Sequence, residues 1–398
     1  MIDSSRVLPE EDGAVATPLV SRKVRWRGVI SLGLLPVAFL LQLIANFHPE
    51  LIEHYYSRGL YPYIGRGLAF VNGLCGFSLA EALTGMLLGG ICLGGVWQAR
   101  RLYLGHARLS MLLRVGLFNL LGVAGVIAIL FLLLWGLNYE RQPLLENLRL
   151  ARREASADEL EAICRAVISE TNRSYEEANA GAKTDPSQLS LSWVELDSTI
   201  ESAYQREPLL GSAAKGGFGP PKPVYFSQIM SRLGIAGIYV PFTGEPNFNA
   251  ELPGCEIPYT IAHEKAHQRG FALEDEANFI AFLVCIKSTD PYARYSGYLM
   301  AATQLLRALN LAAPDRYQSV FATLGVGPRA DLKAIREFWT RYEGRLSQVS
   351  ETINNTYLKA NRIESGVENY SEAVALILSY YFTYPSGDAA NLPQMPTY

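Results

Sequence analysis

Charge is scarce in this sequence: only 18% of its 398 residues are Asp, Glu, Lys or Arg, whereas a soluble globular domain has about a quarter. The deficit is concentrated in residues 28–140, which contain ten charged residues. This distribution excludes a uniformly soluble enzyme and an intrinsically disordered protein. It indicates a membrane part joined to a water-soluble part. The net charge of −3 also speaks against a partner that is a nucleic acid.

Cysteine pairs and strand patterns are scarce as well. None of the five cysteines forms a Cys-x-x-Cys pair, so neither a cysteine zinc site nor a disulfide framework is indicated. Pairing among Cys164, Cys255 and Cys285 in the water-soluble part stays open. Residues 237–242 form the one strand-like run, and most of the remaining water-soluble part has helical periodicity. The sequence therefore predicts a mainly α protein with a small edge strand or sheet.

Three apolar segments approach the length of about 20 residues that a bilayer crossing requires. They lie at about residues 28–47, 82–97 and 115–137. The second is the weakest and carries glycines four residues apart, which predicts a helix-packing face. We predict a cytoplasmic tail over residues 1–27, a three-helix transmembrane region over 28–137, and one extracytoplasmic domain over 138–398.

Basic residues set the expected orientation, since Lys and Arg favour the cytoplasmic side. Four precede the first span and four lie around the second connection, against two between the first and second spans. An amino terminus inside and three crossings export the rest of the chain. Four arginines after the third span oppose this orientation, but long domains translocate largely regardless of charge. These four are Arg141, Arg149, Arg152 and Arg153.

The water-soluble part contains one strong catalytic motif, His-Glu-x-x-His, formed by His263, Glu264 and His267. With five histidines in the chain, a chance match is rare. Pro258 suits the first turn of a helix, and Gly270 suits the left-handed position that ends one. On such a helix the two histidines share a face and can bind Zn²⁺. Glu264 would then lie beside the metal and act as general base for a water molecule.

A catalytic zinc needs a third protein ligand. Leu273 stands where the longer three-histidine motif has its last histidine, so that arrangement is excluded. The sequence from Glu274 to Asn278 resembles the Glu-x-x-x-Asp pattern of glutamate zincins, with Asn278 in the Asp position. We favour Glu274 as third ligand, with Glu276 as second choice, and expect Asn278 to hydrogen-bond a ligating imidazole. Acidic residues at a helix start also have an ordinary explanation in the helix dipole.

Residues 237–253 look like the edge strand that zincins place above the metal. Unpaired main-chain groups of such a strand would bind an extended peptide substrate; an ordinary strand leading into the helix is the alternative. The expected substrate strand is Gly237, Ile238, Tyr239 and Val240. Several side chains could stabilise an oxyanion, and the sequence does not select among them. They are Tyr292, Tyr295, Tyr298, Tyr357 and Asn361.

Five segments together resemble a bacterial family of membrane proteins catalogued as domain of unknown function 3810. The segments are GIYVPFTGE, PYTIAHEKAHQRGF, EDEANFIAFL, RYSGY and TYLKAN. The resemblance extends from the amino-terminal spans to about residue 370. It implies a multi-pass protein of the bacterial inner membrane with a mostly helical, zincin-like α+β domain outside the cytoplasm, and it implies no substrate.

Two functions are compatible with these features. The first is a membrane-anchored zinc metallopeptidase that hydrolyses peptides or proteins of the cell envelope. The alternative is a non-catalytic zincin scaffold that binds a peptide or envelope component and signals through the spans. Glu264 favours the enzyme, because a binding module needs no base there. An intramembrane protease is excluded, because the charged residues around the motif could not lie in a span.

Overall fold

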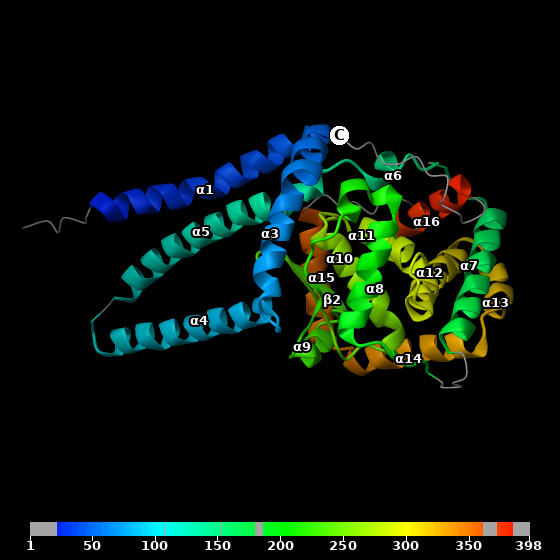
Figure 1. Cartoon of the computed structure of the whole chain (residues 1–398). Helices are drawn as coiled ribbons and strands as arrows, with labels where there is room; N and C mark the ends of the chain where they lie inside the picture. Colours follow the sequence, from blue (N-terminus) through cyan, green and yellow to red (C-terminus); the bar gives the residue numbers. More distant parts are fainter. Residues whose placement is uncertain (1–21, 107, 152, 180–185, 361–371, 385–398) are drawn as a thin grey trace, which may run out of the picture.

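Three long helices project in one direction from a body of shorter helices and one small sheet (Figure 1). The computed structural model describes residues 22–106, 108–151, 153–179, 186–360 and 372–384. Within them the chain is mainly α, as the sequence predicts. All five cysteines are free, which answers the question of pairing among Cys164, Cys255 and Cys285.

The projecting helices are α1 (Arg22–Asn46), α4 (Leu79–Tyr103) and α5 (Leu109–Leu134). Of the described residues, α4 and α5 are each long and apolar enough to cross a membrane. The segments Gly33–Asn46 and Pro49–Gly73 meet the criteria for a crossing only when they are taken together. The two segments are bent by 95° relative to each other, and as one broken span they would be the third crossing. The prediction of spans is confirmed to that extent.

The projecting helices differ in how they pack. Helix α1 lies along α5, whereas α4 stands apart from both (Figure 1). In the described part of the chain, nothing lies within 4 Å of a Cβ built on the glycines of α4, so the predicted packing face has no partner there. The third predicted span, residues 115–137, extends beyond the helix at its carboxyl end. Helix α5 stops at Leu134, and the chain turns into η2 (Gly136–Glu140).

The segment between the first two predicted spans is helical. It comprises α2 (Pro49–Leu51), the π-helix η1 (Ile52–Leu60) and α3 (Tyr61–Gly73). Figure 1 shows α3 running crosswise between the long helices and the body. Tyr61 and Asn72 on its inner side are completely buried. This segment is therefore part of the packed structure and does not form a solvated loop.

The body is built around five helices. Helix α12 packs along α7, and α11 packs on both α10 and α12. Their bounds are α7 Ala157–Ala178, α8 Trp193–Arg206, α10 Ile257–Gln268, α11 Glu274–Ile286 and α12 Pro291–Ala312. Leu, Ile, Val and Phe side chains from these helices form one continuous core.

Shorter elements close the body around that core. They are α6 Leu144–Asn147, η3 Pro208–Ala214, α9 Ser227–Arg232, η4 Gly254–Glu256, α13 Pro314–Phe321, α14 Val326–Tyr342, α15 Arg345–Ala360 and α16 Glu372–Thr383. Helix α16 packs on α11 and α12, which carry the centre of the core.

The sheet has three strands in the order β1–β3–β2. Strand β2 (Gly237–Val240) is an edge strand, antiparallel to β3 (Glu245–Phe248), and β1 (Lys222–Pro223) is parallel to β3. The predicted strand is confirmed, and its partners were missed. Strand β3 is fully buried although it contains Glu, Pro and Asn, and β1 has two residues, so neither shows the apolar alternation that identifies strands.

Buried charges attach the start of α4 to this sheet. The carboxylate of Glu245 accepts hydrogen bonds from the N–H groups of Leu79 and Ala80, at 2.9 and 2.7 Å. An anion at these unpaired N–H groups is stabilised by the helix dipole. The Lys222 ammonium donates to backbone carbonyls in the connection between α3 and α4. Helix α4 therefore begins at a point fixed on the sheet.

Candidate metal centre

Helix α10 carries the His-Glu-x-x-His motif and is buried on almost every side. Pro258 lies in its first turn, and Gly270, with φ of 87°, follows its end. The Gly270 N–H donates to His267 O at 2.9 Å and the Phe271 N–H to Ala266 O at 3.2 Å, which closes the helix as the sequence predicts. The chain then turns back, and α11 begins at Glu274.

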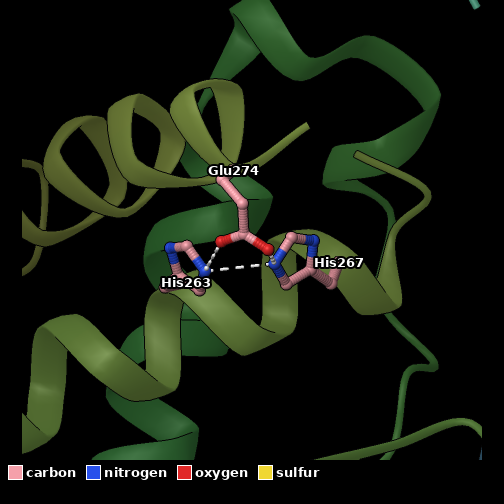
Figure 2. A group of neighbouring side chains, drawn as sticks. All are labelled: His263, His267 and Glu274. Carbon is pink, nitrogen blue, oxygen red and sulfur yellow. Dashed lines mark hydrogen bonds and ion pairs between the residues drawn. The ribbon is translucent and has the colours of Figure 1, made fainter. Parts of the chain in front are cut away.

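This reversal brings three ligand-type atoms together (Figure 2). His263 Nε2 lies 3.0 Å from His267 Nε2 and 3.2 Å from Glu274 Oε2, and His267 Nε2 lies 3.6 Å from Glu274 Oε1. Ligands about 2.0–2.1 Å from a tetrahedral zinc ion are roughly 3.3 Å apart. The three side chains therefore form a group that can hold a metal ion.

The charges of the group favour a cation between the Glu274 carboxylate and the two imidazoles. Burial disfavours the ionised Glu274 carboxylate, but the two imidazoles outweigh it and hold the pKa of Glu274 well below its usual range. Burial also disfavours a charged His267, but Glu274 and Glu264 together raise the pKa of His267 to about 9. Without a metal, a proton on His267 thus supplies the positive charge. A divalent ion can replace that proton.

Glu264 lies beside the group and is 4% exposed. Burial raises the pKa of Glu264 to about 7, although His263 and His267 act against this. Its Oε2 atom has no hydrogen-bond partner among the described residues. A Cβ on Gly237 would lie 2.5 Å from its Oε1 atom, so the carboxylate sits directly against edge strand β2. A carboxylate with a pKa near neutrality can both accept and return a proton.

The two other residues predicted to take part in the site, Glu276 and Asn278, have their hydrogen-bond partners outside the metal group. Glu276 is buried, and its Oε1 atom accepts a hydrogen bond from the Leu144 N–H, so it does not belong to the metal group. Asn278 Oδ1 accepts from the Tyr259 hydroxyl at 3.3 Å. In the described residues no hydrogen bond joins Asn278 to an imidazole; instead His267 Nδ1 lies 2.7 Å from Phe271 O. The Phe271 carbonyl therefore orients the His267 ring, which is the role that was expected of Asn278.

The tyrosines proposed for oxyanion binding are not gathered at this group. Tyr295 donates to buried Asp331, and Tyr292 contacts Ser187, which also binds Asp331. Tyr298 packs against the core. These three side chains hold the body together. The side chain of Tyr357 and all of Asn361 lie outside the described residues.

Comparison with known proteins assigns a family. The family model described as protein of unknown function (DUF3810) matches residues 56–378, most of the chain. The chain belongs to the DUF3810 family. No curated protein and no solved structure matches it. Family membership names no reaction, so the chemistry of this DUF3810 protein has to be argued from its site.

Residues next to the long apolar helices of this DUF3810 protein hold helix α10 in place, and the sequence did not reveal them. Trp135, directly after α5, donates from Nε1 to His267 O at 2.9 Å, and its ring centroid lies 6.0 Å from that of His267. The Tyr61 hydroxyl donates to Gln268 O at 2.8 Å. Arg141 donates to Gly270 O at 2.9 Å. The end of α10 therefore rests on segments that adjoin the long apolar helices.

A buried ion network on the other side of α10 was also missed. Lys265, which is completely buried, donates to Asp197 at 2.7 Å and pairs with Glu201 at 3.0 Å. Arg269 pairs with Glu201 at 2.6 Å. Burial opposes ionisation of Glu201, but the two cations lower its pKa to about 2. A signal was present, because each pair of like charges is four residues apart and so shares a helix face.

Proposed function

We propose that this protein is a membrane-anchored, zinc-dependent metallopeptidase that hydrolyses peptide bonds outside the cytoplasm. The observation that carries the proposal is the convergence of His263, His267 and Glu274 with a buried Glu264 beside them. Two imidazoles and a carboxylate are the donor set of zinc peptidases with a His-Glu-x-x-His helix. We further propose that the body is zincin-like.

The residues around the group fit a bound zinc ion. Two imidazole nitrogens that face each other at 3.0 Å need a shared proton or a cation between them. His263, His267 and Glu274 would hold the ion, with Phe271 O fixing the ring of His267. When bound, zinc supplies Lewis acidity, which lowers the pKa of a water ligand to about 7 and polarises a carbonyl group.

The protein's own groups then have two tasks. Glu264 accepts the proton of the attacking water and returns it to the amine that leaves when the peptide bond breaks. Strand β2, at the edge of the sheet and against Glu264, aligns an extended substrate through main-chain hydrogen bonds. These roles for Gly237, Ile238, Tyr239 and Val240 suit peptides in general, because backbone groups are common to all of them.

The arrangement of the long helices supports three crossings. Helix α1 runs toward the body, α4 runs away from it and α5 returns (Figure 1). The start of α1 and the connection after α4 therefore lie far from the body, on the side where Arg100, Arg101 and Arg108 are found. By the preference of basic residues for the cytoplasm, we propose that the body faces outward from the inner membrane of a bacterial cell.

Removal of the metal tests the function. The full-length protein in nanodiscs, loaded with zinc, should hydrolyse members of a mixed peptide library. A chelator such as 1,10-phenanthroline should abolish the cleavage, and zinc added back in stoichiometric amount should restore it. The products are identified by mass spectrometry. Cleavage that survives complete metal removal would contradict the proposal, as would a zinc-loaded protein that cleaves nothing.

A Gly237→Ala substitution should displace Glu264 and leave the metal in place. The added methyl group would lie 2.5 Å from Oε1 and 2.7 Å from Cγ of Glu264, so the carboxylate must move. We expect kcat to fall about 10- to 100-fold with unchanged zinc content. Gly344→Ala is the matched control, because no described atom lies within 4 Å of its Cβ. Equal kcat for both variants would remove Gly237 from the site.

A further inference from the structure

The segment η1–α3 (residues 52–73) and its flanks have a packed inner side and an exposed outer side. The inner side buries the polar residues Glu53, Ser57 and Asn72 together with Tyr56 and Tyr61. Its outer side is exposed and apolar, and Tyr63 and Phe70 are each 73% exposed. The other exposed apolar side chains there are Leu51, Tyr55, Leu60, Val71, Leu74 and Phe77. Many exposed apolar side chains along one segment mark a site of interaction with a membrane or another protein.

The position of the segment identifies what covers this surface. It leaves the membrane helix α1 at a bend of 95° and leads, after a short connection, into the membrane helix α4. In Figure 1, α3 lies across the direction of the three long helices, at the level where they meet the body. Of the bent pair counted above, we take α1 as the crossing and Pro49–Gly73, which is bent from it by 95°, as lying in the plane of the bilayer. Exposed Tyr and Phe side chains suit the boundary between headgroups and acyl chains.

The metal group lies close to that plane. Trp135 directly follows the last residue of α5 and contacts His267, and Tyr61 of α3 binds the end of α10. Edge strand β2 lies beside α3, because the hydroxyl of Tyr239 contacts that of Tyr61. The same strand exposes an apolar side chain, since Ile238 is 45% exposed. A chain in extended form gains at most about 3.6 Å per residue. A polypeptide that leaves the bilayer beside α5 would therefore reach the metal group within roughly ten residues.

We propose that the substrate of this site is itself a membrane-anchored polypeptide, cleaved close to where it leaves the bilayer, and that the apolar face of η1–α3 rests on the lipid surface and positions the site there. This inference rests on the proposed function. The reaction is hydrolysis: water adds across the C–N bond, a carboxylate and an amine form, and one product stays in the membrane. The bilayer confines enzyme and substrate to one surface, which raises their effective concentration.

The lipid contact is tested without any cleavage. Cys75 and Cys92 are replaced by serine, and a fluorophore is attached at Tyr63→Cys or Phe70→Cys in the full-length protein in nanodiscs. Lipids with a nitroxide near the headgroup should remove most of the fluorescence at both positions, whereas aqueous iodide should have little effect. Lys333→Cys, on exposed α14, should show the reverse. Iodide quenching at positions 63 and 70 would overturn the lipid contact, and shielding from both quenchers would assign the face to a protein partner.

The substrate class is tested in bacterial membrane vesicles that contain membrane proteins and enclosed soluble proteins. Native protein and its Glu264→Gln variant are compared, and new chain termini are mapped by mass spectrometry. The proposal expects termini specific to the native protein within roughly ten residues of predicted spans. Native-specific termini in soluble proteins or far from spans would overturn the substrate class and leave the metallopeptidase intact. A complete lack of native-specific termini would overturn both, while the quenching result would still stand by itself.

Discussion

Replacing Glu264 by Gln should leave the zinc in place and lower kcat by about 10²- to 10⁴-fold, the range for loss of a general base. Gln has nearly the same shape but cannot accept the proton of the attacking water. The carboxylate it replaces is buried, and burial raises the pKa of Glu264 to about 7, as suits proton transfer near neutrality. Zinc content and peptide hydrolysis are measured on the same preparation.

Glu256→Gln is the matched control for this experiment. Glu256 is also buried, and burial raises its pKa to about 7 as well, but its carboxylate accepts a hydrogen bond from Trp339. The described residues show no interaction between Glu256 and the metal group. Its substitution should leave kcat within about twofold of the native value, since it removes no catalytic group. Native activity in Glu264→Gln would exclude Glu264 as the general base.

Replacing His263 by Ala should reduce the zinc content from about one ion per chain to near zero at limiting metal. The substitution removes one of three ligands, and it leaves Glu274 and His267 paired with each other. His48→Ala is the control, because His48 is exposed at the start of α2 and far along the chain from the group. Elemental analysis after gel filtration gives the stoichiometry for native and variant proteins.

The His263 result separates two explanations of the motif. Unchanged zinc content in His263→Ala, with native circular dichroism, would mean that the metal is held elsewhere and that His263 is not a ligand. Loss of zinc together with loss of the folded state would instead show that the metal is structural. The account expects loss of zinc and of hydrolysis with retained helical content.

The local part of the site was predictable because it depends on helical spacing and end signals. His263 and His267 are four residues apart, and Pro258 and Gly270 mark the two ends of α10 as observed. The reversal that presents Glu274 follows from the same glycine. The placement of Asn278 depends on how α11 packs against its neighbours. In the structure the Tyr259 hydroxyl donates a hydrogen bond to Asn278 Oδ1. Side-chain partners of this kind are set by tertiary contacts and leave no periodic signal.

The junction with the membrane could not be predicted from hydropathy. Trp135 lies inside the predicted span 115–137, yet it follows the end of α5 and donates to the carbonyl of His267. Residues 48–76 connect the first two predicted spans, and their helices α2, η1 and α3 were not predicted. Their helices expose apolar and aromatic side chains on the outer side although their inner side is also packed, so hydropathy does not separate the two sides. Only the packed structure shows which face is covered.

The central claim is that His263, His267 and Glu274 hold one zinc ion. X-ray absorption at the zinc edge of the purified native protein tests it most directly, because it reports the ligand atoms and their distances. The account predicts about one zinc per chain with two imidazole nitrogens at about 2.0–2.1 Å and carboxylate or water oxygen at a similar distance. A shell of sulfur ligands at about 2.3 Å, or the lack of imidazole scattering, would contradict it.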